Sequence, residues 1–203
     1  MNERAATDDV VANCQLVQRE REGRDLCWWE AARDCFHPDS IVNVGWFEGS
    51  GAEFVAGSAR MAEAGGATAH RLAPPIVHLG DDRAVVLLAA VITSRAVVSG
   101  QELDLEADCR IVYRTERRDG HWRIAAMDCI YCRDTLTPAV PGEPFRVPAD
   151  ELASLRPSYR MLAWSFARRG IPVRSDLLGE DQPARVAAFL DSAFAWAGID
   201  PAR

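Results

Sequence analysis

Apolar residues recur at helical spacing through the first third of the chain. In residues 7–22 they return every third or fourth position behind a Thr-Asp-Asp start, which predicts a capped amphipathic helix that ends at Gly23. A second helix is predicted from near Asp25 to Phe36 and a third in segment 49–66, with a strand over Ile41–Phe47 between them. The chain is therefore expected to begin with three helices.

The pattern then changes to apolar runs and strict alternation up to about residue 135. It predicts strands over Pro75–Leu79, Ala84–Val98, Glu102–Glu116 and His121–Arg133, separated by short polar turns of which Asp119-Gly120 is typical of a β-hairpin. Three helices followed by a mostly antiparallel sheet indicate the α+β class. We expect a curved sheet that forms a cone around a cavity, with the three helices packed on one face.

The composition shifts after Asp134, where four of the eleven prolines fall in a short span that reads as a linker. Two further helical patterns follow, at about residues 158–169 and 183–197, each with an apolar stripe that must be covered. We therefore predict a domain over residues 1–138 and a helical extension over residues 139–203. The extension is expected to dock either on its own domain or on a second subunit of a homodimer or other homo-oligomer.

Charge and composition limit the kinds of partner that the protein is expected to bind. The 30 acidic and 23 basic side chains give a formal charge of −7, which argues against a nucleic-acid or anionic membrane surface. The sequence shows neither an apolar run of the roughly 18 residues that span a bilayer nor an export signal, so a cytoplasmic location is expected. The six cysteines lie in apolar patterns typical of reduced core thiols. Cys129 and Cys132 fall on opposite faces of a predicted strand, which disfavours a shared metal or disulfide.

Several motifs occur together in a specific order. These are GRDLCWWEAARDCFHPDS, WFEGSGAEFV, the Ala-His pair ending at His70, and CRIVYRTERRDGHWRIAAMDCIYCRDTLTP. Over roughly residues 8–140 the chain resembles the SnoaL-like members of the nuclear transport factor 2-like superfamily, and its tail resembles an extension found in an uncharacterised bacterial branch. That superfamily includes scytalone dehydratase, ketosteroid isomerase, polyketide cyclases, a hexachlorocyclohexane dehydrochlorinase and non-catalytic proteins. The resemblance therefore implies the fold but no single activity.

The resemblance also implies a pair of site residues. In the dehydratase and dehydrochlorinase branch, an Asp near the junction of the first two helices partners a His that opens a later strand. Here Asp25 lies fourteen residues before Asp39 of the FHPD motif, as in that branch, and His70 follows the third helix. An Asp that fixes the imidazole tautomer would let the other ring nitrogen abstract a proton next to a carbonyl. Judged without the resemblance, Asp25 would be a helix N-cap and His70 an ordinary loop histidine.

Two further polar candidates lie in the predicted strands. The resemblance implies that Arg110, on the charged face of its strand, points into or near the cavity, where it would polarise a carbonyl oxygen. Asp128 stands alone in an apolar row, and burial would raise its pKa and suit it to act as a neutral donor or a base. Tyr131 is predicted to face the other way and to lie in an interface.

Aromatic side chains complete the predicted site. Trp28, Trp46 and Phe54 are expected to line the cavity as wall or core and to favour a hydrophobic ligand. The sequence shows no metal-ligand cluster, no Gly-rich phosphate loop and no nucleophile elbow, so no cofactor or metal is expected.

Two functional hypotheses follow. The first is a cofactor-independent lyase or isomerase that abstracts a proton from a small, hydrophobic, cyclic carbonyl compound. His70 would act as base, Asp25 would orient it, and Arg110 or Asp128 would stabilise the developing charge. The second is a non-catalytic module of the same fold that binds a small apolar ligand or serves in assembly.

Overall fold

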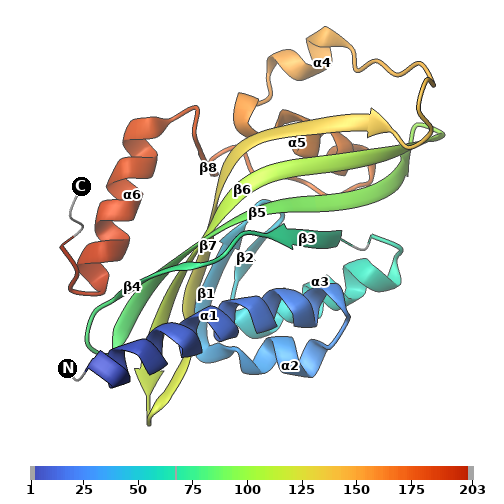
Figure 1. Ribbon diagram of the computed structural model, residues 1–203. Coiled ribbons are helices and arrows are strands. Elements are labelled where there is room, and N and C mark those ends of the chain that lie inside the picture. Colours follow the sequence, from blue (N-terminus) through green and yellow to red (C-terminus); the bar gives the residue numbers. More distant parts are fainter. Residues whose placement is uncertain (1–2, 67, 201–203) are drawn as a thin grey trace.

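The protein has a mixed α+β fold built on one strongly curved sheet (Figure 1). The computed structural model describes residues 3–66 and 68–200. Three N-terminal helices precede most of the sheet: α1 (Glu3–Asp25), α2 (Trp29–Asp34) and α3 (Gly51–Glu63). Helix α3 begins with a capping box, in which Ser50 and Glu53 satisfy each other's free backbone N–H groups. The predicted fold class is confirmed.

The sheet is mostly antiparallel and is dominated by three long strands. Its strands run in the order β2-β1-β7-β6-β5-β3, and β1 pairs with β7 in parallel. The bounds are β1 (Phe36–Val44), β2 (Phe47–Gly49), β3 (Thr68–Leu72), β4 (Ile76–Leu79), β5 (Arg83–Val98), β6 (Gln101–Arg118) and β7 (His121–Pro138). Register shifts after Asp108 and Arg114 interrupt the β6–β7 ladder, as β-bulges do where a sheet bends.

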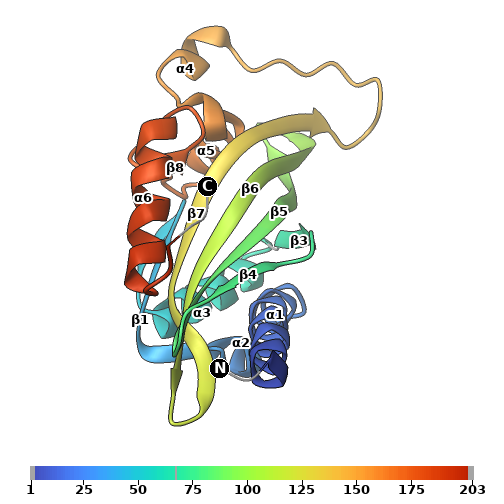
Figure 2. The same ribbon diagram turned by 60° about the vertical axis from the view of Figure 1, so that its left-hand side comes forward.

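The two faces of the sheet support different cores. On the inner face, Ile111, Tyr113 and Met127 pack with α1 and α3 around the cavity described below. On the outer face, Val112 and Ile130 pack under the last helix, α6 (Pro183–Trp196). Figure 2 shows α6 and α1 on opposite sides of the sheet. Alternation along β6 and β7 therefore decides which side chains can reach the cavity.

The extension wraps around one end of the sheet and packs on it. It contains α4 (Ala149–Ala153), a 3-10 turn (Pro157–Tyr159), α5 (Arg160–Arg168), a short β8 (Leu178–Gly179) that pairs with β7, and α6. Asp134 of β7 accepts a hydrogen bond from the backbone N–H of Leu162 at 2.7 Å, which anchors the start of α5. Within the described residues the extension packs on the sheet of its own chain, and α6 covers Val112 and Ile130.

Some element boundaries differ from the predictions. Gly23 does not end the first helix, which continues to Asp25. A Cβ at Gly23 would lie 3.1 Å from the Ala32 nitrogen, so glycine permits α2 to pack against α1. The predicted second helix is only six residues long, and β1 already begins at Phe36. Neither α4 nor β8 was predicted, because such short elements carry little periodic signal.

Candidate functional site

Asp25 and His70 form a hydrogen-bonded pair between the end of α1 and the middle of β3. The distance from His70 Nδ1 to Asp25 Oδ1 is 2.6 Å, and the His70 backbone N–H donates to Asp25 Oδ2 over 2.8 Å. The His70 side chain is fully buried, whereas 19% of the Asp25 side chain is exposed. The carboxylate assigns the proton of the neutral ring to Nδ1, so Nε2 carries the lone pair.

Two arginines of α1 face that lone pair. Nη1 of Arg21 lies 3.4 Å from His70 Nε2, and Nη1 of Arg24 lies 3.5 Å from it. The Arg24 guanidinium also donates from Nε to Ser58 Oγ at 3.0 Å and lies over the ring of Phe54, 5.0 Å from its centroid. The base candidate is therefore flanked by a carboxylate on one nitrogen and by two cations on the other.

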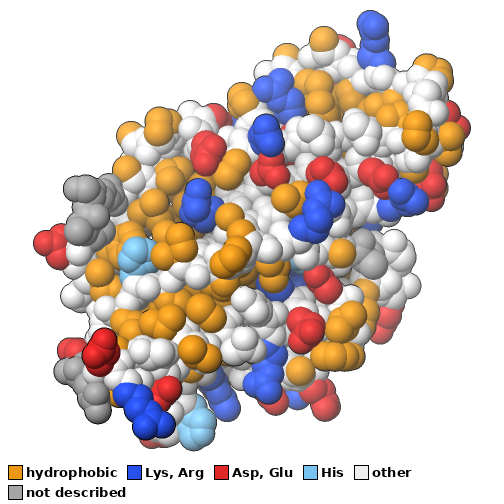
Figure 3. Space-filling view, viewed as in Figure 1, with side chains coloured by type: hydrophobic (Ala, Val, Ile, Leu, Met, Phe, Trp, Pro, Cys, Tyr) orange, Lys and Arg blue, Asp and Glu red, His pale blue; other side chains and the backbone are white. Residues whose placement is uncertain are grey.

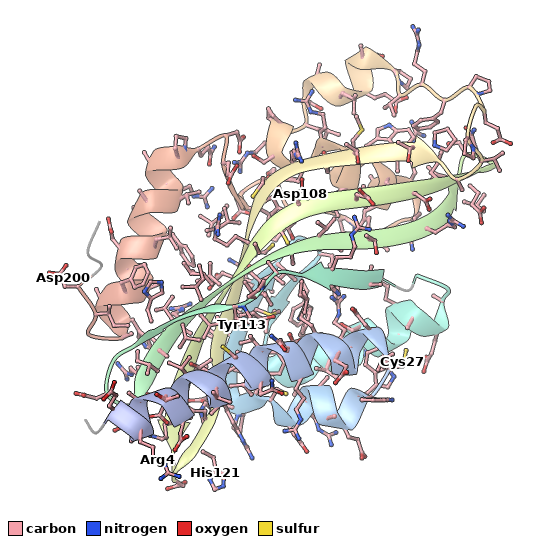
Figure 4. All side chains as sticks on the ribbon, in the orientation of Figure 1. Arg4, Cys27, Asp108, Tyr113, His121 and Asp200 are labelled. Atoms are coloured by element: carbon pink, nitrogen blue, oxygen red, sulfur yellow. The ribbon has the colours of Figure 1, made fainter. Side chains whose placement is uncertain are left out.

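A buried ion pair supports the first of these arginines. Arg21 is paired with Glu20, and both side chains are almost completely buried. Tyr113 donates its hydroxyl to Glu20 Oε2 at 3.1 Å, and Figure 4 shows Tyr113 between α1 and the sheet. A buried carboxylate needs such partners, because desolvation of an unpaired charge is costly. Glu20 thus neutralises Arg21 within the fold.

The site opens onto a small cavity of about 40 Å³ inside the curved sheet. At roughly 10–15 Å³ for each water position, this volume holds about three water molecules. Arg21, Arg24 and His70 supply its charged and titratable wall together with Tyr131, while most other lining groups are apolar. Trp46 and Phe54 stack with centroids 5.5 Å apart on one side, and Leu162 and Phe166 of α5 close another side.

Burial and charge set the basicity of the polar groups. Burial lowers the pKa of His70 to about 4, repulsion from Arg21 and Arg24 acts in the same direction, and the hydrogen bond to Asp25 opposes both. Burial, and then repulsion from Arg21, lowers the pKa of Arg24 to about 10. His70 is therefore neutral, and Arg24 still charged, near pH 7.

Several predicted site residues are placed elsewhere. Arg110 and Asp128 alternate with the cavity-facing residues of β6 and β7, so the expectation that they reach the cavity is wrong. Asp128 instead pairs with Arg114 at 3.1 Å and accepts from Asn43 at 3.3 Å, and burial raises its pKa. Trp28 is 55% exposed and does not line the cavity.

The remaining candidates have the following positions. Trp46 and Phe54 do line the cavity. The N-cap interpretation of Asp25 is wrong, because this residue ends α1 and Trp28 occupies the position before α2. Tyr131 does face away from Asp128, but it lines the cavity, and its hydroxyl accepts from the Gly45 N–H at 2.8 Å.

Sequence reasoning missed Arg21, Arg24 and the contribution of α5. A signal existed for the first two, because Arg21, Arg24 and Asp25 lie at positions i, i+3 and i+4 and so share one face of a helix. Within residues 3–66 and 68–200, no group of three or more His, Cys, Asp or Glu residues is placed to hold a metal ion. In the same part of the chain, no helix is both long and apolar enough to cross a membrane.

Comparison with known sequences places the chain among related proteins. A model of the SnoaL-like domain family matches residues 5–128. An uncharacterized protein of Emericella nidulans is 34% identical over 190 residues, which cover 87% of this chain and 80% of that protein. Pea pathogenicity protein 2 of Fusarium vanettenii is 34% identical over 161 residues, 77% of this chain and 69% of that protein. These relatives are fungal, so the expected bacterial branch is not supported.

Comparison with solved structures finds the same fold at low sequence identity. A hexachlorocyclohexane dehydrochlorinase from Novosphingobium barchaimii has a TM-score of 0.58 and 16% identity, over 72% of this chain and all of that one. A putative scytalone dehydratase from Novosphingobium aromaticivorans has a TM-score of 0.54 and 13% identity, over 71% of this chain and 100% of that one. At these identities the likeness establishes the fold.

Proposed function

The chain belongs to the SnoaL-like domain family, and from this premise we propose that it is a cofactor-independent lyase or isomerase that removes a proton from a small carbonyl compound. The observation that carries the proposal is the Asp25–His70 pair, with its 2.6 Å contact, at the wall of an enclosed and mostly apolar cavity. Solved relatives of the same fold whose names include a dehydrochlorinase and a putative dehydratase support this reaction class.

The first step transfers a proton from carbon to His70. Nε2 takes the proton as the C–H bond breaks, and the electron pair of that bond forms an enolate whose negative charge develops on the carbonyl oxygen. Asp25, which already accepts from Nδ1–H, stabilises the imidazolium. Arg21 and Arg24 take the place expected for Arg110 or Asp128, since their guanidiniums flank Nε2 and would bind the oxyanion.

The second step decides between the two reaction types. In a lyase, the enolate expels a leaving group from the neighbouring carbon with its bonding electrons, and the imidazolium returns the proton to that group. In an isomerase, the same proton returns to a different carbon of the substrate. A substrate with a six-membered ring would require a wall to move, because about 40 Å³ is too little for such a ring. Leu162 and Phe166 of α5 form the wall contributed by the extension.

Hydrogen–deuterium exchange tests this proposal without a known substrate. We expect the protein to accelerate deuterium uptake at the carbon next to the carbonyl of cyclopentanone or butan-2-one in D2O, followed by NMR. His70→Ala should slow that uptake by about 10²- to 10⁴-fold, which is the usual contribution of a positioned base. His121→Ala is the matched control, because His121 lies exposed at the β6–β7 turn. Uptake at the wild-type rate in His70→Ala would contradict the role of His70.

A second candidate function is non-catalytic binding of a small ligand in the same cavity. The lowered pKa of His70, about 4, favours it, because so weak a base removes protons from carbon slowly. Under this alternative no compound exchanges deuterium, and ligand affinity depends more on Trp46 and Phe54 than on His70. Uptake catalysed by the wild-type protein and lost in His70→Ala excludes it.

A further inference from the structure

In the part of the chain that the structure describes, no carboxylate touches the Arg24 guanidinium, and Glu20 and Asp25 act on its charge only from a distance. Within residues 3–66 and 68–200 no carboxylate forms an ion pair with Arg24, whereas Arg21, one turn earlier on α1, is paired with Glu20. The groups in direct contact with the Arg24 guanidinium are neutral: the Ser58 hydroxyl, the ring nitrogen of His70 and the faces of Phe54 and Trp46. Among the residues that the structure describes, Arg24 is therefore a cation at the cavity wall without a directly paired carboxylate.

The acidic groups nearby are already occupied. Both oxygens of Asp25 bind His70, one at Nδ1 and one at the backbone N–H. Glu20 is held by Arg21 and by the hydroxyl of Tyr113. Carboxylates at a distance stabilise a desolvated guanidinium only in part, and an anion in direct contact with Arg24 would stabilise it further. Burial, and then repulsion from Arg21, lowers the pKa of Arg24, although Glu20 and Asp25 oppose the shift.

We propose that the substrate of this site carries a carboxylate, and that Arg24 binds it. The inference rests on the proposed function of the same site and names the class of compound that the site takes. A planar guanidinium suits a carboxylate, because two parallel N–H groups match its two oxygens. Arg24 Nη1 is 3.5 Å from His70 Nε2, so the bound carboxylate would lie beside the base. The apolar remainder of the substrate would contact Val44, Ile92 and Ile111.

A bound carboxylate would also change His70. The charged and titratable groups around this ring are the following: Glu20, Arg21, Arg24 and Asp25 on α1, Tyr113 on β6, and Cys129 and Tyr131 on β7. The two arginines disfavour the imidazolium, and an anion between them offsets their repulsion. Substrate binding would thus make His70 a stronger base in the complex than in the free protein. The low basicity of the ring in the free protein is then compatible with proton abstraction in the complex.

Two probes of matched shape test the charge requirement: isobutyrate and isobutyramide, titrated into the full chain by calorimetry at pH 7. Both contain only four carbon atoms, in keeping with the small volume of the cavity. We expect isobutyrate to bind about 10- to 100-fold more tightly, as for a charge-assisted hydrogen bond in a partly buried site. Arg24→Met should reduce that preference to about twofold or less, and Arg24→Lys should retain part of it.

The matched control is Arg19→Met, on the exposed side of the same helix, which should leave the preference unchanged. Circular dichroism and the urea midpoint establish that each variant is folded, and Arg24→Lys keeps the test decisive if Arg24→Met does not fold. Three results would overturn the proposal: equal binding of the two probes, a preference that survives loss of the Arg24 charge, or no detectable binding of isobutyrate up to about 10 mM.

The proposed proton transfer and the proposed carboxylate site can be refuted independently of each other. His70→Asn should abolish deuterium uptake while leaving the preference for isobutyrate intact. If isobutyrate is preferred through Arg24 but no carbonyl compound exchanges deuterium, the carboxylate site stands and the proposed reaction is wrong. If neutral ketones exchange rapidly and isobutyrate is not preferred, the reaction stands and the carboxylate site is wrong.

Discussion

Replacing His70 by asparagine should remove a pH-dependent part of the stability of the fold. The folded protein lowers the pKa of His70 from its usual 6.5 to about 4, so between these values the unfolded chain binds a proton that the folded chain does not. The contribution of His70 to the free energy of unfolding is therefore complete above pH 6.5, and it is lost as the pH falls toward 4. At ~1.36 kcal/mol per pH unit, the interval corresponds to about 3 kcal/mol, of which about 2 kcal/mol is lost between pH 7 and pH 4.5.

The measurement is urea unfolding of wild type and His70→Asn at pH 7, 5.5 and 4.5. Asparagine can still donate to Asp25, and the carboxyl groups that titrate in this range are common to both proteins, so their effects cancel in the difference. The stability of wild type relative to the variant should fall by about 2 kcal/mol over this range. His121→Asn, which replaces an exposed histidine at the β6–β7 turn, is the matched control. A His70→Asn difference that is constant with pH would refute the reasoning.

Three other changes have defined outcomes. Tyr113→Phe leaves Glu20 short of a buried donor and should cost about 1–3 kcal/mol in urea unfolding, and a loss below about 0.5 kcal/mol would contradict that role. Phe166→Ala should cost about 3–5 kcal/mol and let cyclopentanone bind more tightly, and unchanged affinity would show that α5 does not limit the cavity. Asp25→Asn removes the anion that favours the imidazolium, so NMR titration should place the pKa of His70 below its wild-type value, and an unchanged or higher value would argue against the pairing.

The sequence predicted the sheet well because alternation and turn residues are local signals. The hairpin at Asp119-Gly120 and the long strands before and after it are examples, and both residues of that turn have positive φ angles. Local signals failed at Gly23, where the reason for glycine is the approach of α2 rather than a helix end. A glycine that serves packing and a glycine that ends a helix look the same in a sequence.

The candidate site was predictable in part, for a different reason. Alternation separates the two faces of a strand but does not say which face encloses the cavity, so Arg110 and Asp128 were assigned to the wrong side. The proximity of Asp25 to His70 depends on contacts between elements that are distant in the sequence. It was predicted from the family resemblance alone. Arg24 could have been noted from its helical spacing to Arg21. That no carboxylate pairs with it directly, within residues 3–66 and 68–200, is a property of the folded chain.

Because the extension packs against the cavity, it affects how this cavity is compared with the cavities of related proteins. The matched family region ends at residue 128, yet Tyr131, Leu162 and Phe166 all line the cavity. Figure 3 shows a further apolar area over β4, between α1 and α6, where Ile76 is exposed. Grafting the family region alone into another scaffold would leave the pocket without one wall. Differences in ligand size among relatives are thus to be sought in a segment that lies outside the region by which the family is recognised.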